Sequence, residues 1–493
     1  MSKSSSQLPS ISAILAAAAL ALSGCKVGPD YVPPDNGVFR GHDAPSAFVE
    51  QAQPGTTSTT APGDSIETLW WSSLNDQTLS DLIARAIGSN NDLRLAIERI
   101  AEARAARGIA AGAGLPTLDS RAGYSRSRQS ENTEQGRFGN DSSSGRDNYF
   151  VGLDAGWELD VFGGIARSVE AAQGDIEALD ADRRDVQVIL AAEVARNYVD
   201  LRGFQQRILV TLGNVRAQAD TLGLTDSRFK AGLTSELDVV QARALLETTR
   251  AAIPPLEESA RAAVHRLRVL MGLPPGSSID ALDGEGPIPV APSRIAIGLP
   301  SELVARRPDI RRAERQLAAQ TARIGVATSD LFPKFSLTGS FGLESAQIGS
   351  LPQGDSRFWS IGPAVRWPIF QGGRIRANIE VQESRARQAL LTYDQTVLIA
   401  FEEVENALVS FSRSQARRDS LAEAVAANRR AVELSTELNR AGLADFQRVL
   451  DSQTDLAQTE EQQVAGEQAV VQALIRLYKA LGGGWQTASP QSQ

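Results

Sequence analysis

The sequence predicts a duplicated fold of mixed α and transmembrane β structure, in which each half holds a β-hairpin followed by long helices. Three observations predict it. First, the chain matches itself at two offsets. Second, residues 117–253 and 369–489 contain no proline and include long stretches with helical spacing of apolar residues. Third, apolar and polar residues alternate with a period of two in the segments that lie between the predicted helices. Of the 493 residues, 42% are hydrophobic and only 5% aromatic, which excludes collagen-like, disulfide-rich and wholly disordered chains.

The first element in chain order is an export signal. Residues 11–22 form an apolar run of 12, too short to cross about 30 Å of hydrocarbon as a helix. Leu22-Ser23-Gly24-Cys25 closes the run and resembles the bacterial lipobox. That resemblance implies cleavage before Cys25, acylation of Cys25, and sorting to the outer membrane because Lys26, not aspartate, follows. An ordinary signal peptide with an incidental cysteine is the alternative.

A tandem duplication orders the remaining elements. An offset of 217 aligns residues 92–118 with 309–335, and an offset of 210 pairs Trp157 with Trp367 and Gly272 with Gly482. Repeats of about 200 residues are too long for solenoid units, so we expect a duplicated fold. The predicted segments are a signal peptide (1–24), a lipidated N-terminal and equatorial segment (25–88), a first repeat (89–281), a Pro-rich linker (282–300), a second repeat (301–481) and a C-terminal tail (482–493).

Long helices fill the proline-free stretches. Apolar residues step by threes and fours from Val186 to Val215 and again from Leu390 to Phe411. This spacing places an apolar seam along a helix that packs against partner helices. An uninterrupted helix from Arg374 to Arg440 would be about 100 Å long, which predicts an elongated molecule. A soluble coiled-coil rod fits this part equally well.

Predicted strands distinguish a membrane protein from such a rod. In the expected hairpins, residues 117–162 and 334–370, apolar and polar or small residues alternate, as in strands that face lipid on one side and a wet lumen on the other. Residues 117–163 and 332–371 hold 13 of the 27 aromatics, an enrichment that aromatic girdles require. The expected lipid-facing belt comprises Tyr149, Trp157, Phe335, Phe341, Trp359 and Trp367.

The number of strands predicts an assembly. Four strands cannot close a barrel, and the hydrocarbon core does not tolerate an open sheet edge. Other copies must therefore complete the barrel, and an eight-stranded barrel made by two copies would be filled by its own side chains. We expect a homotrimer with a 12-stranded β-barrel, continued by a barrel of twelve helical paths.

Charge and residue counts exclude several classes of function. The net charge is −9 and no Lys/Arg block occurs, so nucleic-acid binding is not expected. His42, His265 and Cys25 are too few and too far apart for a His/Cys metal site. No Gly-rich phosphate loop, His-containing triad or Gly-x-Ser-x-Gly occurs, so we expect no enzyme, catalytic residue or cofactor. A periplasmic rod or adaptor would share the helices but would not need the strands.

Several short motifs carry a resemblance to a known family. They are Lys26-Val27-Gly28-Pro29-Asp30-Tyr31, Gly163-Gly164, Gly372-Gly373, Leu331-Phe332-Pro333, Ala231-Gly232-Leu233 with Asp238, and Ala441-Gly442-Leu443 with Asp451. Together with the lipobox and the two repeats, they resemble the TolC-like outer-membrane efflux factors. Within these, the chain is most similar to the lipoprotein (OprM/NodT-like) branch that serves resistance-nodulation-division (RND) pumps.

The resemblance implies an outer-membrane exit duct that performs no chemistry. Such a duct conducts drugs or other small molecules passively, extends into the periplasm, and meets a periplasmic adaptor joined to an inner-membrane RND pump. The outer-membrane duct of a type I protein-secretion system has the same architecture and is the alternative. The partners expected are two further copies, the adaptor, the pump and outer-membrane lipid.

Two glycines mark the periplasmic turns of this duct. Gly232 and Gly442 each follow the end of one long helix and precede another. Glycine at a helix C-terminus admits φ > 0, so the chain can reverse direction there.

The resemblance also places a gate beside these turns. Asp238 and Asp451 match acidic positions that narrow the closed entrance, and Arg440 and Arg448 are candidate ion-pair partners. Gln447 departs from the family, because members of this branch often have an apolar constriction residue there. Solvated aspartates in the first turn of a helix, favoured by its dipole, are the alternative.

Overall fold

The computed structural model describes residues 26–34, 48–49, 58–62, 68–128, 130 and 145–485. Cys25 and the signal peptide lie outside the described residues, so lipidation stays a prediction. The chain forms two compact units: unit 1 contains Met1–Pro34, Ile100–Ala178 and Ala313–Thr392, and unit 2 contains Asp35–Arg99, Leu179–Arg312 and Tyr393–Gln493.

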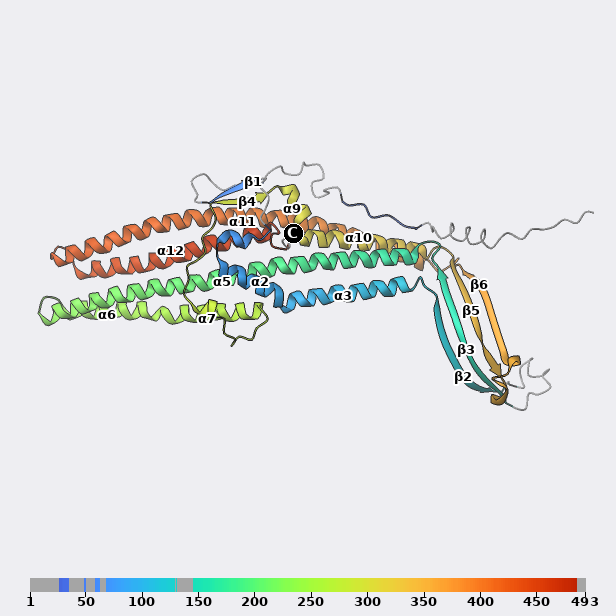
Figure 1. Cartoon of the computed structure of the whole chain (residues 1–493). Coiled ribbons are helices and arrows are strands. Elements are labelled where there is room, and N and C mark those ends of the chain that lie inside the picture. The colour runs from blue at the N-terminus through green and yellow to red at the C-terminus, as the bar shows by residue number, and fades with distance from the viewer. Residues whose placement is uncertain are drawn as a thin grey trace, which may run out of the picture. The chain divides into compact units, whose positions relative to one another are not determined.

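Unit 1 contains a four-stranded antiparallel sheet with the strand order β2-β3-β5-β6 (Figure 1). Its strands are β2 (Thr117–Ser127), β3 (Arg146–Leu159), β5 (Lys334–Ser345) and β6 (Arg357–Arg366). The short helices η3 (Ile348–Ser350) and η4 (Gly354–Ser356) lie in the β5–β6 connection. Most of the β2–β3 connection lies outside the described residues. The strands form where the alternation predicted them.

Four helices lead into and out of these strands. They are α3 (Asn91–Gly112) before β2, α5 (Gly164–Lys230) after β3, α10 (Pro308–Ser329) before β5 and α11 (Arg374–Arg440) after β6. Both α5 and α11 have 67 residues, so the uninterrupted helix predicted from Arg374 to Arg440 is confirmed. Within unit 1, α5 and α10 approach closely because their contact uses small residues: a Cβ on Gly174 would lie 2.9 Å from that of Ala319.

The helices that return from α5 and α11 belong to unit 2. They are α6 (Glu236–Ala251) and α7 (Ile253–Leu270) in the first repeat and α12 (Phe446–Ala480) in the second. Pro254 and Pro255 occupy the first turn of α7, where a missing N–H costs least, and they separate α7 from α6. The second repeat has no proline at these positions, so α12 runs unbroken for 35 residues. No helix in the described part of the chain is both long and apolar enough to cross a membrane.

The core of unit 2 joins the segment that precedes the first repeat to the last helix. Trp70 of η2 (Trp70–Leu74) stacks on Tyr478 of α12 with ring centroids 5.2 Å apart. Asp76 caps α2 (Gln77–Ser89) and accepts a hydrogen bond from Tyr198 at 2.7 Å. These contacts tie three segments that are far apart in sequence into one apolar centre.

The predicted Pro-rich linker is more ordered than its composition suggests. It includes β4 (Arg294–Gly298), which pairs in parallel with β1 (Thr59–Pro62), and the short helices α8 (Asp280–Asp283) and α9 (Pro300–Arg306) flank β4. Ile295 and Ile297 alternate along β4 and are buried, which gives this edge strand an apolar side to pack.

The duplication is exact in hydrogen-bond register. Thr117 of β2 pairs with Gly156 of β3. Adding 217 to the first number and 210 to the second gives Lys334 and Arg366, which are paired between β5 and β6. The same offsets relate two ring hydrogen bonds. Trp157 Nε1 donates to the carbonyl of Gly114 at 2.9 Å, and Trp367 Nε1 donates to that of Leu331 at 3.1 Å. Both offsets, first seen as residue identities, therefore describe equivalent positions in space.

Candidate functional site

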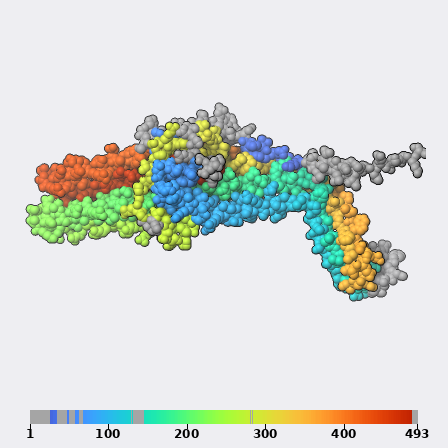
Figure 2. All heavy atoms as spheres, in the orientation of Figure 1, coloured from blue at the N-terminus to red at the C-terminus, as the bar shows by residue number. Residues whose placement is uncertain are grey.

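The register of the sheet separates an apolar face from a polar face. One row across the four strands reads Ser120, Leu153, Phe341 and Trp359, and the adjacent row, on the opposite face, reads Asp119, Asp154, Ser340 and Ser360. Of the apolar row, Phe341 is 57% and Trp359 73% exposed in the single chain. In Figure 2, no helix covers the face of these strands that is turned toward the viewer. Large apolar side chains left bare in this way mark a surface made for lipid or a partner.

Aromatic side chains lie near both ends of the apolar face. Register places five of the predicted belt residues on that face, and Trp367 directly follows β6. Trp157 lies at the helix end of the sheet, whereas Tyr149 lies at the other end, where its ring contacts that of Tyr124 with centroids 4.8 Å apart. Trp157 lies eight positions after Tyr149, which is about 26 Å along a strand. This spacing matches the apolar band of an outer-membrane barrel.

The polar face carries charges and small residues. Arg121 forms an ion pair with Asp154 at 2.7 Å, and Asn148 donates to Glu344 at 2.7 Å. Gly152 and Gly342 lie directly opposite one another in β3 and β5 on this face. Such a surface can face water. The sheet therefore has one apolar and one polar face, which is the pattern of strands that separate lipid from a water-filled lumen.

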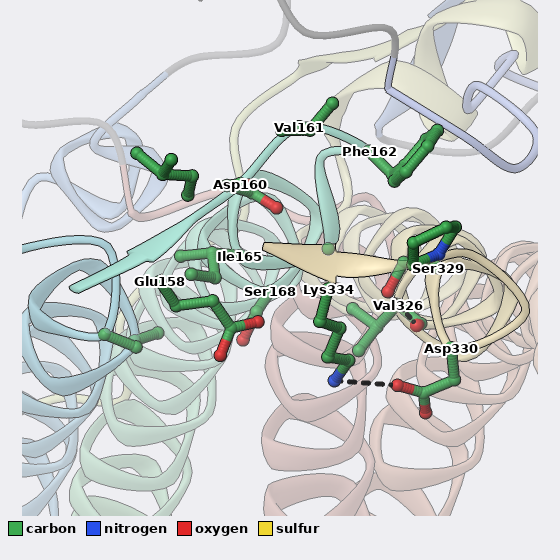
Figure 3. A pocket seen from close by; sticks show the side chains of 15 residues that line it. Glu158, Asp160, Val161, Phe162, Ile165, Ser168, Val326, Ser329, Asp330 and Lys334 are labelled. Carbon is green, nitrogen blue, oxygen red and sulfur yellow. Dashed lines mark hydrogen bonds and ion pairs between the residues drawn. The ribbon is translucent and has the colours of Figure 1, made fainter. Parts of the chain in front are cut away.

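A pocket with a mixed apolar and polar lining lies in unit 1 where the strands meet the helices (Figure 3). It has a volume of about 290 Å³ and is lined by residues of β3, α5, α10 and β5, among them Glu158, Ser168 and Ser329. Lys334, at the start of β5, forms an ion pair with Asp330 at 3.0 Å. Within the described residues, no three His, Cys, Asp or Glu side chains are grouped so that they could hold a metal ion.

The two predicted turn glycines adopt the same left-handed conformation. Gly232 has φ 73° and Gly442 has φ 72°. In both turns the next residue donates back to a helix carbonyl: Leu233 N to Arg228 O and Leu443 N to Leu438 O, each at 2.9 Å. This is a Schellman motif, which satisfies the last carbonyls of a helix while the chain reverses. The prediction that glycine is needed here for φ > 0 is confirmed at both positions.

Asp238 is held by the helix end on which it lies. Its carboxylate accepts hydrogen bonds from the Thr234 hydroxyl and from Ser235 N at 3.1 Å, and the Ser235 hydroxyl accepts from Asp238 N at 3.3 Å. This is a capping box at the start of α6. The hydrogen bond from Thr234, with those from Ser235, lowers the pKa of Asp238, because each stabilises the ionised carboxylate.

Asp451 has a different setting. It lies beyond the first turn of α12, it is exposed, and its carboxylate accepts a hydrogen bond from Gln447 at 2.7 Å. Arg440 and Arg448 are also exposed, and in the described part of the chain neither forms an ion pair with Asp238 or Asp451. The helix-first-turn alternative therefore describes Asp238 but not Asp451.

Asp445 is a residue of these turns that the sequence analysis missed. It caps α12, and its carboxylate accepts from Arg448 N at 3.2 Å. The offset of 210 relates it to Ser235, the cap of α6. Asp445, Asp238 and Arg440 line one groove of about 520 Å³ between the two helix pairs. Its position three residues after the turn glycine, like that of Ser235, was the signal that could have identified it.

A polar seam joins α5 to the second helix pair within unit 2. Five side chains of α5, spaced by seven residues, each bond a side chain of α11 or α12. This is the heptad period, so these residues lie along one line of the helix. The pairs are Asp200 with Gln468 and Gln472, Arg207 with Glu461, Asn214 with Glu460, Thr221 with Gln453, and Arg228 with Asn439. The sequence analysis followed only apolar spacing and therefore missed it.

We expect Asp200→Asn to raise the melting temperature slightly at neutral pH. Burial raises the pKa of Asp200, against the opposing hydrogen bonds from Gln468 and Gln472. Because the folded-state pKa lies above that of the unfolded chain, the free energy of unfolding falls as the pH rises through the interval between them. Asparagine keeps both hydrogen bonds without a charge. Melting curves from pH 4 to 8 should show the difference from wild type shrinking as the pH falls, and a constant difference would contradict this account.

With this geometry in view, similarity to known proteins decides the family. The sequence profile of the outer membrane efflux proteins matches residues 82–273 and 299–483, more than half of the chain. The chain belongs to the outer membrane efflux protein family. The match falls in two separate segments of similar length. Nodulation protein T of Rhizobium leguminosarum bv. trifolii is 32% identical over 466 residues, 94% of this chain and 96% of that protein.

Two further comparisons agree with this family. Outer membrane protein OprJ of Pseudomonas aeruginosa is 34% identical to the chain over 484 residues, which covers 96% of each. The solved structure of the outer-membrane channel OprN superposes with a TM-score of 0.84 at 36% identity, covering 94% of this chain and all of that one. This outer membrane efflux protein therefore has the TolC-like channel fold and belongs in the outer membrane. Its relatives are channels and efflux proteins, not enzymes.

Proposed function

We propose that this outer membrane efflux protein is the exit duct of a tripartite RND pump, which conducts drugs or other small molecules passively to the exterior. The observation that supports this most directly is a four-stranded sheet, apolar on one face and polar on the other, that continues into two pairs of long helices. Such a sheet can separate lipid from water, but only as part of a closed barrel, because an open sheet edge leaves backbone groups unpaired in the hydrocarbon core. A periplasmic adaptor and an inner-membrane pump are the proposed partners.

The proposed assembly is a homotrimer. The sheet ends at β2 and β6, and both outer strands are exposed along most of their length. An unpaired edge in hydrocarbon leaves backbone N–H and C=O groups without partners, so the edges need strands from other copies. Three copies give twelve strands and a lumen wide enough to conduct, whereas eight strands enclose a packed interior.

The proposed domain limits and the lipid anchor complete this picture. The repeats span 89–281 and 301–481, with residues 1–24 removed as a signal peptide and an acylated Cys25 holding the mature chain in the inner leaflet. Residues 26–31 are held against the helices and strands of unit 1, where Val27 N donates to Phe162 O at 3.3 Å and Tyr31 donates to Glu314 at 3.1 Å. Mass spectrometry of the mature N-terminus tests the anchor, and an unmodified Cys25 would overturn it.

Planar-bilayer recordings with the purified protein test the proposed function. A duct should insert as a trimer, detected by native mass spectrometry, and conduct ions without any energy source. A stable monomer, or a trimer that never conducts, would contradict the duct. Deleting the gene should make cells retain small toxic compounds, whereas loss of a secreted protein with normal efflux would favour a type I secretion duct instead.

The proposed gate consists of Asp238, Asp451 and Gln447 at the periplasmic turns, with Arg440 and Arg448 pairing to carboxylates of a neighbouring copy. Threefold symmetry would make each aspartate a ring of three carboxylates, which repel one another and attract cations. The positions of Asp238 and Arg440 in one groove at the turns, and the exposure of Asp451 and both arginines, support this arrangement.

We expect Asp238→Ala with Asp451→Ala to raise single-channel conductance and weaken block by divalent cations, because the cation-binding rings are lost. Asp238→Ala also breaks the α6 capping box, which costs about 1 kcal/mol. The single variant Asp451→Ala leaves both helix caps intact and separates gating from helix stability. If the double variant conducts and is blocked like wild type, Asp238 and Asp451 are ordinary surface carboxylates.

A further inference from the structure

We propose that Lys334, Arg366 and Arg374 form a binding site for small anions on the polar face of the sheet, where the second hairpin meets its helices. Its ligands are solutes that carry a phosphate, sulfate or carboxylate group. The proposal rests on the duct proposed above, in which the polar face lines the lumen, and it adds a class of solute that the lumen holds.

The three cations line one pocket of about 440 Å³ in unit 1, which we call the basic pocket. Lys334 begins β5, Arg366 ends β6, and Arg374 is the first residue of α11. Among the described residues that line the pocket, Asp330 is the only carboxylate. The pocket is large enough for phosphate or a small organic anion.

The register of the second hairpin brings two of the cations together. Lys334 lies directly opposite Arg366 between β5 and β6. Both belong to the polar face, because each is an even number of residues from Ser340 or Ser360 in its strand. Like charges in opposed positions of a sheet repel each other. An anion bound between them would relieve a cost that the fold already carries.

Only part of this positive charge is compensated. Lys334 forms an ion pair with Asp330 at 3.0 Å (Figure 3). The Arg366 side chain is exposed and has no ion pair or hydrogen bond with any residue that the structure describes. Arg374 donates to the neutral side chain of Gln371 at 2.9 Å. Two guanidinium groups therefore keep their charge available, and their planar donors match phosphate and carboxylate oxygens.

The equivalent pocket of the first repeat has the opposite charge. That pocket, described above, contains Glu158 and Asp160 at the start of α5. The offset of 210 relates Glu158 to Pro368 and Gly164 to Arg374, and all four residues line their pockets. The second repeat thus has one carboxylate fewer and one cation more at these positions. Because the same hairpin and helix form with either set, the fold does not require the cations.

The start of α11 adds to the preference for an anion. In α5, Ala166 N donates to the carboxylate of Asp160 at 2.7 Å. The offset relates Ala166 to Arg376 and Asp160 to Phe370, so α11 has no carboxylate at the matching position, and its first turn holds no acidic residue. The N-terminus of a helix carries a partial positive charge. In the second repeat this charge adds to that of the three side chains.

Threefold assembly would repeat the basic pocket around the lumen. Three copies of three cations would form a positive ring at the start of the barrel. Rings of Lys and Arg side chains favour anions and phosphate in pores. We expect the ring to retain anionic solutes on their way to the exterior.

Thermal melting of the full-length protein in detergent tests the site, with inorganic phosphate as the probe. A ligand that binds only the folded state raises the melting temperature with its concentration. We expect phosphate to raise it more than chloride does at equal ionic strength. Arg366→Gln with Arg374→Gln should need roughly tenfold more phosphate for the same rise, because two charged donors are lost.

The matched control is Arg385→Gln with Arg387→Gln, which removes two exposed arginines of the same helix outside the basic pocket. Phosphate also stabilises folded proteins in general, and this control measures that contribution at the same net charge. We expect the control to respond to phosphate like wild type. An equal response of wild type and the Arg366/Arg374 variant would overturn the site, as would an equal loss in the control.

Single-channel recordings separate this inference from the proposed function. Phosphate should reduce the wild-type current at concentrations that leave the Arg366/Arg374 variant unaffected. A wild-type channel that conducts but responds to phosphate like this variant would overturn the site in the lumen and leave the duct intact. A protein that binds phosphate through these residues in the melting experiment but never conducts would contradict the duct and not the site.

Discussion

Arg167→Ala should release the N-terminal segment, residues 26–31, from the rest of unit 1. The Arg167 side chain lies in the first turn of α5 and is 1% exposed. Its guanidinium donates to the carbonyls of Val27 at 3.1 Å and Gly28 at 3.3 Å, and to carboxylates of Asp30 at 2.7 Å and Glu170 at 3.0 Å. Alanine removes every one of these bonds. Losing a buried, charged hydrogen-bonding group costs about 3 kcal/mol, which would make the detached segment roughly 100-fold more populated.

Limited proteolysis followed by mass spectrometry measures this release, because cleavage of an open segment follows its population. The matched control is Arg323→Ala, which removes a half-exposed ion pair with Asp175 at 2.6 Å and should cost less than about 1 kcal/mol. Gly28→Ala should imitate Arg167→Ala, because Gly28 has φ 88° and an added Cβ would lie 2.5 Å from the Cα of Gly325. Cleavage of Arg167→Ala at the wild-type rate would show that other contacts hold the segment.

Trp70→Ala should be among the most destabilising single changes in unit 2. The Trp70 side chain is 1% exposed, stacks on Tyr478, and meets the edge of Trp71 with ring centroids 5.6 Å apart. Truncation would leave a large cavity where η2 packs on α12, and such changes cost about 3–5 kcal/mol. We expect the melting temperature in detergent to fall by roughly 5–10 °C.

Two variants check that packing, not the loss of any tryptophan, causes this effect. Trp70→Phe keeps an aromatic ring against Tyr478 and should lose less than half as much. Trp359→Ala removes a side chain that is 73% exposed in the single chain and should hardly change the melting temperature in detergent, where the apolar face is covered. Equal melting temperatures for Trp70→Ala and wild type would mean that this contact does not support unit 2.

Local patterns predicted the elements of this fold because their causes are local. Alternation in 149–157 and 359–367 reflects which face of a strand is apolar, and it needs no knowledge of the strand's partner. Likewise, an absence of proline and a seam of apolar residues predict a long helix, and Gly442 marks where it ends, close to the observed end of α11. Gly232 and Gly442 were predictable because only glycine adopts φ near 70° without strain.

Other features could not be predicted from the sequence, because they depend on contacts with distant segments of the chain. The break between α6 and α7 could be inferred from Pro254, but the order of β4 could not, since its partner β1 is more than 200 residues away in sequence. Asp238 and Asp445 both follow turn glycines, yet only the backbone geometry shows that one closes a capping box and the other caps its helix directly.

The sequence by itself determined the duplication, the four strands with their apolar face, the long helices and the family. Residue identities show the duplication, the spacing of apolar residues shows the strands and helices, and short motifs show the family. Only the tertiary structure decided which side chains meet: the burial of Arg167 around the N-terminal segment, the stacking of Trp70 on Tyr478, the polar seam along α5, and the register of β3 with β5. The physical reason is that a period specifies the direction in which a side chain points, whereas its partner depends on how the whole chain packs.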